Sequence, residues 1–266
     1  MVYAFSIHII SGYAPEPVKE LAKEDNMEPR EKIIFALDVE HFEEAQKLVM
    51  EFKDHVGMFK VGKQLFTHCG PKIVDFINMK NSKVFLDLKY HDIPNTVAKA
   101  VIEAAQLGVE LVNVHASGGF TMMKDAVVAL HDAVRNQGLH KPKIIGVTVL
   151  TSLDDTELKR LGFGISVIEL TKRLALLTKE AGLDGVVAGG SEIEMIREIC
   201  GKDFIIVTPG VRVDDKKNDQ KRTITPGEAI EKGATYIVLG RAVRDHQDPR
   251  GLLEKISKDI SCAVTH

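Results

Sequence analysis

Apolar and polar positions repeat along the chain in one pattern from residue 33 onward. Short apolar runs are each followed by a polar turn and then by a segment with apolar residues at helical spacing. Strands are predicted at residues 33–39, 58–61, 84–89, 109–114, 143–150, 185–188, 204–208 and 236–239. Helices are predicted at 41–52, 71–79, 94–106, 120–135, 154–161, 166–181, 192–200 and near 249–260, and a further one opens at the capping box of residues 225–228.

The number of these units predicts the fold class. Eight strand–helix units in about 230 residues match the size and rhythm of an α/β fold of the single-domain (β/α)₈ barrel type. A doubly wound open sheet is the alternative, but it needs fewer units and a reversal of strand order that the sequence does not show. We therefore assign residues 31–266 to one barrel domain and residues 1–30 to an N-terminal extension of unknown role.

The first part of the chain differs from the rest. Residues 2–10 are apolar, but the run is short and no basic residues precede it, so we do not expect a signal peptide. Met27 lies a few residues before the first predicted strand and could be the biological start. In that case residues 1–26 would be an upstream extension.

Polar and charged residues gather where the predicted strands end. In a (β/α)₈ barrel the carboxyl ends of the strands build the active site. We therefore expect eight side chains to converge on one pocket: Asp38, Lys60, Asp87, Lys89, His115, Thr151, Arg212 and Arg241.

The strand at 84–89 carries the most unusual pattern. Alternate residues are apolar, which leaves Asp87 and Lys89 together on the opposite face. Burying these charges is costly unless they pair with each other or with further charges, and an exposed ion pair on a surface strand is the alternative. Asp92 lies past the strand, on the turn before a helix that Pro94 can open, so its side chain is free to point elsewhere.

Two further strand ends carry candidate chemistry. Gly240 and Arg241 follow the eighth strand, where barrels of this kind often bind phosphate, although a helix cap with a solvated charge is the alternative. His115 could be a base or a ligand. No second His or Cys stands at metal-ligand spacing, so we favour a hydrogen-bonded structural histidine.

The polar stretch 212–223 has almost nothing to bury. It is either a disordered surface loop or a lid that closes over a ligand, with Arg212 at its hinge and Gln220 at its tip.

Composition narrows the possible partners. The chain has 266 residues, of which 44% are apolar, and a net charge of −3 without a dense basic run, so neither nucleic acid nor a membrane surface is expected as a partner. No apolar run approaches the ~18 residues of a membrane span. Cys69, Cys200 and Cys262 are scattered and odd in number, which favours a reducing, cytoplasmic location over a disulfide framework. The expected ligand is a small molecule.

The run Asp87-x-Lys89-x-x-Asp92 is the D-x-K-x-x-D signature of the orotidine 5′-monophosphate decarboxylase superfamily, and residues 85–96 resemble the form found in bacterial orotidine 5′-phosphate decarboxylases. The signature alone leaves sugar-phosphate relatives open. The resemblance extends in unbroken order over residues 31–260, through the segments 36–38, 60–63, 112–119, 149–152, 208–212 and 239–241.

The resemblance implies decarboxylation of orotidine 5′-monophosphate to uridine 5′-monophosphate in de novo pyrimidine biosynthesis, with no cofactor and no metal. Lys89 would protonate C6 of the pyrimidine, and Asp87 would lie near the substrate carboxylate, held by Lys60. A homodimer with shared active sites is implied, in which three residues reach the partner's site: Asp92, Ile93 and Thr96.

The resemblance also distributes the substrate contacts. Asp38 and Lys60 would contact the ribose, and Thr151 and Ser152 would lie at the pyrimidine edge. Pro209 belongs to the matched segment after the seventh strand and is counted with the substrate-binding residues. The 5′-phosphate would be bound by Arg212, Gln220, Gly240 and Arg241.

Two other functions remain open. A relative that acts on a sugar phosphate would need a divalent metal, which Asp87 and Asp92 could hold, although Lys60 and Lys89 oppose this electrostatically. A non-catalytic nucleotide-binding barrel is the other alternative, against which the intact Asp87 and Lys89 speak.

Overall fold

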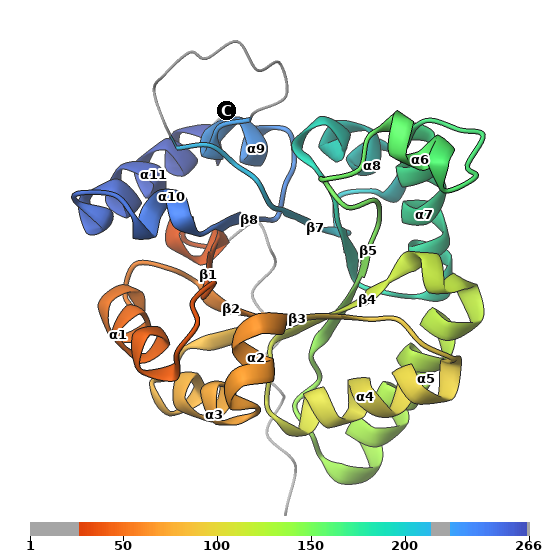
Figure 1. Ribbon diagram of the computed structural model, residues 1–266, viewed down its shortest axis with the longest axis horizontal. Helices are drawn as coiled ribbons and strands as arrows, with labels where there is room; N and C mark the ends of the chain where they lie inside the picture. Colours follow the sequence, from red (N-terminus) through yellow and green to blue (C-terminus); the bar gives the residue numbers. More distant parts are fainter. Residues whose placement is uncertain (1–26, 214–223, 265–266) are drawn as a thin grey trace, which may run out of the picture.

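The computed structural model describes residues 27–213 and 224–264 and shows a closed barrel of eight parallel strands in sequence order (Figure 1). Pairing of the first strand with the eighth closes the barrel, so the fold prediction is confirmed and the open-sheet alternative is wrong. The strands are β1 (Ile33–Ala36), β2 (Met58–Gly62), β3 (Lys83–Tyr90), β4 (Leu111–His115), β5 (Lys143–Val147), β6 (Gly185–Val187), β7 (Ile205–Thr208) and β8 (Tyr236–Leu239).

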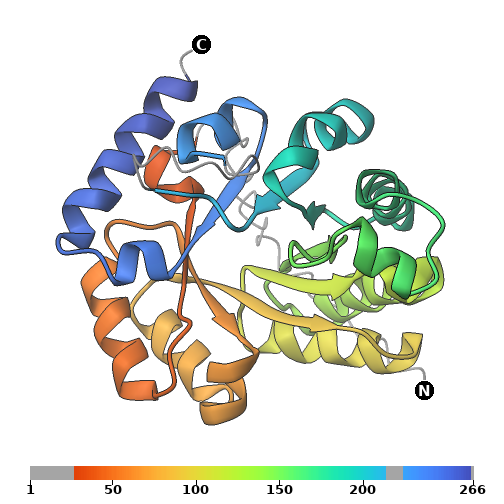
Figure 2. The same cartoon turned by 45° about the horizontal axis from the view of Figure 1, so that its top comes forward.

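Helices surround the strands, as both views of the ribbon show (Figure 1, Figure 2). They are α1 (Phe42–Phe52), α2 (Lys63–Cys69), α3 (Lys72–Met79), α4 (Pro94–Gln106), α5 (Gly119–Gln137), α6 (Asp155–Arg160), α7 (Val167–Ala181), α8 (Ile193–Cys200), α9 (Pro226–Glu231), α10 (Arg241–Arg244) and α11 (Pro249–Val264). None of the helices in the described part of the chain is long and apolar enough to cross a bilayer.

The strands bury side chains on both faces, as expected for a barrel covered by helices. One set fills the barrel interior, and it consists of Ile34, Met58, Phe85, Leu111, Ile145, Ile205 and Val207. The larger apolar cluster lies between the strands and the surrounding helices, and alternate residues such as Phe35, Val84 and Leu86 belong to it. This alternation places Asp87 on the interior side of β3, because it has the same parity as Phe85.

Several predicted boundaries differ from the structure. β1 and β5 end three residues earlier than expected, so Asp38 and Thr151 stand on loops above the barrel. The turn predicted after β2 is the helix α2, which the short apolar pattern did not reveal. The predicted capping box is confirmed: the Thr225 hydroxyl accepts a hydrogen bond from the Glu228 N–H, and the Glu228 carboxylate accepts one from the Thr225 N–H.

The pairing of β3 with β4 is irregular at the height of the predicted site. Leu86 pairs with Val112 and Tyr90 pairs with Val114, so three residues of β3 face the single residue Asn113 of β4. Within this bulge Lys89 has a φ of 53°, the left-handed conformation that costs a non-glycine residue about 1–3 kcal/mol. Bulges of this kind re-aim side chains next to active sites.

At the opposite end of the barrel, the chain enters β1 through a 3₁₀ turn at Pro29–Lys32. Gly57 precedes β2 here, and its N–H donates to the Ile33 carbonyl over 2.9 Å. A Cβ at Gly57 would lie 2.2 Å from the Glu31 carbonyl oxygen, so the close approach of these two backbone segments requires glycine.

We expect Gly57→Ala to destabilise the fold by about 1–3 kcal/mol, because the added methyl group meets backbone atoms that must shift. Gly164→Ala is the matched control, since a Cβ at Gly164 has no neighbour within 4 Å. The check is the urea midpoint of both variants. Equal midpoints would show that the contact between these segments is not needed.

Candidate active site

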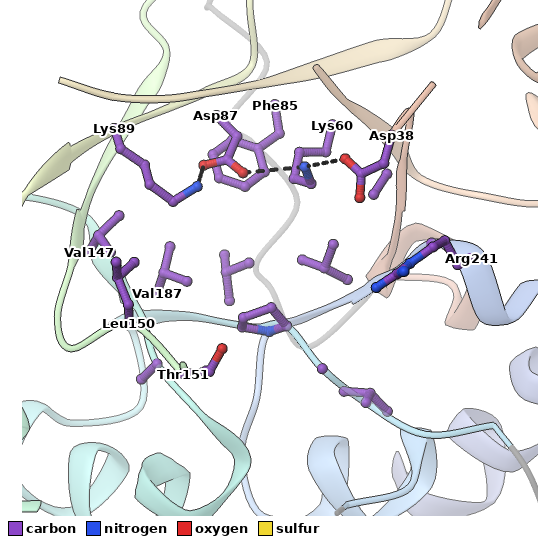
Figure 3. A pocket seen from close by; sticks show the side chains of 18 of the residues that line it. Asp38, Lys60, Phe85, Asp87, Lys89, Val147, Leu150, Thr151, Val187 and Arg241 are labelled. Atoms are coloured by element: carbon purple, nitrogen blue, oxygen red, sulfur yellow. Dashed lines mark hydrogen bonds and ion pairs between the residues drawn. The ribbon is translucent and has the colours of Figure 1, made fainter. Parts of the chain in front are cut away.

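A cavity of about 460 Å³ opens at the carboxyl ends of the strands (Figure 3). Apolar side chains from β5, β6, β7 and the loop after β5 form one wall, among them Val147, Leu150 and Val187. The predicted site residues that line the cavity are Asp38, Lys60, Asp87, Lys89, Thr151, Pro209, Gly240 and Arg241.

Four of these residues form a row of alternating charges (Figure 3). Lys60 Nζ lies 3.1 Å from Asp38 Oδ1 and 3.3 Å from Asp87 Oδ2, and Lys89 Nζ lies 2.5 Å from Asp87 Oδ1. The side chains of Lys60 and Asp87 are 12% and 10% exposed. The alternative of an exposed surface ion pair is therefore wrong.

Alternation of sign offsets the cost of burying the Lys60 and Asp87 charges. Removal of one partner from a buried ion pair leaves an uncompensated charge and typically costs about 3–5 kcal/mol. Asp87 is the central member, since its two oxygens bind Lys60 and Lys89 separately. The two ammonium groups are thereby fixed on the cavity wall with little freedom to reorganise, which is the condition for electrostatic stabilisation of a developing anion.

Asn113 is a site residue that the sequence analysis missed. It is fully buried on β4; its Nδ2 donates to Asp87 Oδ1 over 2.6 Å, and its Oδ1 accepts from the Lys89 backbone N–H over 2.8 Å. The available signal was a single amide within the otherwise apolar run 111–114 of a predicted strand, next to the strand of Asp87. A buried amide of this kind needs polar partners, and a charged neighbouring strand end provides them.

The other end of the cavity has the features of an anion site. Arg241 lies on the side of Asp38, away from Lys89 (Figure 3). Gly240 and Gly210 bring main-chain atoms to the cavity wall, and Gly210 has a φ of 73°, a conformation that favours glycine. Backbone N–H groups together with a guanidinium are suited to bind a phosphate.

Within residues 27–213 and 224–264, two predicted substrate-binding residues near the cavity, Arg212 and Ser152, do not line it. Arg212 is half-buried, and its backbone N–H donates to the Ile224 carbonyl over 3.0 Å. Ser152 is exposed on the loop after β5. Gln220 and most of the predicted lid lie outside the described residues, so the lid stays a prediction.

The end of the signature also lies apart from the charge row of its own chain. Asp92, Ile93 and Thr96 are exposed, and Ile93 is 66% exposed. Asp92 Oδ1 accepts a hydrogen bond from the adjacent Ile93 N–H over 2.6 Å. As predicted, Asp92 lies on the turn beyond β3, and α4 begins at Pro94.

Among the described residues, no side chain or backbone group forms the hydrogen bond that we predicted for the His115 ring. The ring instead contacts that of His91, with 5.3 Å between the two ring centroids. The pKa of His115 is lowered, chiefly by burial and then by the neighbouring His91, Lys63 and Lys89 charges, which outweigh the opposite effect of Asp87.

Comparison with known proteins agrees with this geometry. A family model described as "Orotidine 5′-phosphate decarboxylase / HUMPS family" matches residues 31–256. The chain is an enzyme of this family. Among curated relatives, an orotidine 5′-phosphate decarboxylase of Syntrophotalea carbinolica is 49% identical over 90% of this chain and 98% of its own length, and one of Geobacter sulfurreducens is 51% identical over 87% and 96%.

The chain is also similar to solved structures of the same family. The crystal structure of orotidine 5′-phosphate decarboxylase from Lactobacillus acidophilus superposes with a TM-score of 0.75 and 35% identity, covering 85% of this chain and 97% of that one. The corresponding structure from Pyrococcus horikoshii has a TM-score of 0.69 and 27% identity, with coverages of 86% and 99%. The resemblance inferred from the sequence is thereby confirmed.

The lowered pKa of His115 predicts a pH dependence of stability. Because the unfolded chain binds a proton at about pH 6.5 and the folded state resists it, the unfolded state holds more protons and stability falls as the pH drops below that value. We expect His115→Gln to lose less stability than the wild type between pH 7.5 and 5. Urea midpoints across this range test it, and parallel pH curves for both proteins would contradict it.

Proposed function

We propose that this enzyme decarboxylates orotidine 5′-monophosphate to uridine 5′-monophosphate in de novo pyrimidine biosynthesis, without a cofactor, and that Lys89 protonates C6. The observation that carries the proposal is the Asp38–Lys60–Asp87–Lys89 row, with Lys60 and Asp87 largely buried, on the wall of a cavity that also has a phosphate-type end. The proposal is also supported by membership of the family and by the similarity to curated relatives named orotidine 5′-phosphate decarboxylase.

The cavity accommodates the parts of this nucleotide in order. The 5′-phosphate lies at Gly240 and Arg241, and the ribose hydroxyls contact Asp38 and Lys60. The pyrimidine lies against the apolar wall, with its edge toward Thr151 and its C6 carboxylate toward Asp87 and Lys89. Binding of the remote phosphate supplies free energy that holds the reacting carbon against the charge row.

In the chemical step, the bond between C6 and the carboxylate carbon breaks and carbon dioxide leaves. The electron pair stays on C6, where the fixed ammonium of Lys89 stabilises the developing negative charge. The same ammonium then transfers its proton to C6, which gives uridine 5′-monophosphate and a neutral Lys89 that takes a proton from solvent. No separate electron acceptor is needed, because the electron pair ends in the new C–H bond.

The donors around Asp87 favour this reaction over a metal-dependent one. Its oxygens already bind Lys60, Lys89 and Asn113, so little lone-pair capacity remains for a divalent cation. Asp92, which would complete such a metal site, lies apart from the row in its own chain. We therefore favour the nucleotide reaction over that of a metal-dependent sugar-phosphate enzyme.

We further propose a homodimer with shared active sites. Asp92, Ile93 and Thr96 are exposed at the end of the signature and are not among the described residues that line the cavity of their own chain. An exposed isoleucine beside a carboxylate suits an interface in which a second copy receives both. In the dimer Asp92 would extend the charge row of the partner's site beyond Lys89.

Turnover of orotidine 5′-monophosphate is the direct test. We expect wild-type protein to release carbon dioxide and uridine 5′-monophosphate in excess EDTA. Lys89→Ala should lower kcat by about 10³-fold or more, because it removes both the proton donor and the fixed charge, and should still bind uridine 5′-monophosphate. Lys83→Ala, at the other end of the same strand, is the matched control and should turn over normally. Activity lost with EDTA would refute the cofactor-free reaction.

Shared sites predict complementation between two inactive variants. After subunit exchange, a Lys89→Ala chain and an Asp92→Ala chain form mixed dimers with one site free of both changes. Half of the dimers are mixed, so about a quarter of the wild-type activity should return. Native mass spectrometry verifies the exchange, and verified mixing without recovery would show that each site is built from one chain.

A further inference from the structure

The bulge in β3 leaves Lys89 without a regular partner in the sheet. Residues 87–89 face only Asn113 of β4, so the ladder that would engage the Lys89 N–H is interrupted. A buried backbone N–H without an acceptor is costly, and the side chain of Asn113 accepts this one over 2.8 Å. The amide oxygen thus replaces the missing carbonyl of the neighbouring strand.

The other half of the same amide holds the carboxylate. Asn113 Nδ2 donates to Asp87 Oδ1, the oxygen that also binds Lys89 Nζ, while Asp87 Oδ2 faces Lys60. One buried side chain therefore fixes the backbone of Lys89 and the carboxylate that its ammonium contacts. The amide supplies an acceptor and a donor at once, which an apolar residue of similar shape does not.

From this geometry we propose that Asn113 is a positioning residue for the decarboxylation. It acts through Lys89 and Asp87: it keeps Lys89 in its left-handed conformation and stops the Asp87 carboxylate from rotating. The ammonium is thereby held where the proton is delivered. This inference rests on the proposed function, because it assigns to Asn113 the alignment of the general acid.

Asn113→Leu removes both hydrogen bonds and keeps the number of side-chain heavy atoms. We expect kcat for orotidine 5′-monophosphate to fall about 10²-fold, because a small misplacement of a reacting group has this effect. KM should change by less than about threefold, since the phosphate and ribose contacts are untouched. Asn78→Leu is the matched control: its amide donates to the Leu107 carbonyl over 2.9 Å outside the cavity, and kcat should stay at the wild-type value.

Asn113→Asp tests the positioning role through the pH dependence of kcat, which a purely structural role would leave unchanged. This variant also provides a test if Asn113→Leu does not fold. When the new carboxyl group is ionised it repels Asp87. When it is protonated it can donate to Asp87 and accept from the Lys89 N–H, as the amide does. The kcat of this variant relative to wild type should therefore rise as the pH falls from 8 toward 6.

Hydrogen exchange of the Lys89 amide tests the positioning independently of turnover. It should be protected in the wild type and in Asn78→Leu, and faster in Asn113→Leu. The proposal would be overturned if Asn113→Leu left the protection of the Lys89 amide unchanged, or if this variant folded and kept the wild-type kcat. It would also be overturned if Asn78→Leu lowered kcat as much as Asn113→Leu, or if the kcat of Asn113→Asp relative to wild type did not change with pH. If wild-type protein did not turn over the nucleotide, the proposed function would fail, and Lys89 exchange would still decide whether Asn113 fixes this backbone.

Discussion

The Asp87 carboxylate is the point on which the site depends. It lies almost fully buried on the inner side of β3, where an unpaired charge would be prohibitive, and it is satisfied by Lys60, Lys89 and Asn113. Each of these donors comes from a different strand, and the three strands β2, β3 and β4 are adjacent. The same contacts that make the carboxylate tolerable therefore fix two ammonium groups on the cavity wall. The contacts of Asp87 with Lys60, Lys89 and Asn113 therefore stabilise the fold and also position the charged groups of the candidate site.

The parallel barrel makes this arrangement available. All eight strands end on one side, so side chains that are far apart in sequence meet around one cavity. The loop after β1 and the strands β2, β3 and β4 supply the charges and the amide. β5 to β7 supply an apolar wall, and the segments after β7 and β8 supply main-chain atoms and Arg241. The proposed nucleotide would meet a matching surface at its ring, its sugar and its anionic end.

The strand β3 departs from regular geometry at the site. A regular β3 would continue its ladder to β4, but the bulge places three residues opposite Asn113 and puts Lys89 at positive φ. This conformation is unfavourable for lysine, and the surrounding hydrogen bonds hold it.

The sequence by itself determined the strand–helix rhythm, the barrel and the convergence of Asp38, Lys60, Asp87 and Lys89, because hydrophobic period and strand-end position are local properties that barrel topology translates into space. It did not reveal α2, the early ends of β1 and β5, the Asn113 bridge or the ring contact of His115. The Asn113 bridge depends on which residue of β4 faces which residues of β3. Register between neighbouring strands, and the bulge that shifts it at Lys89, are decided only by tertiary packing.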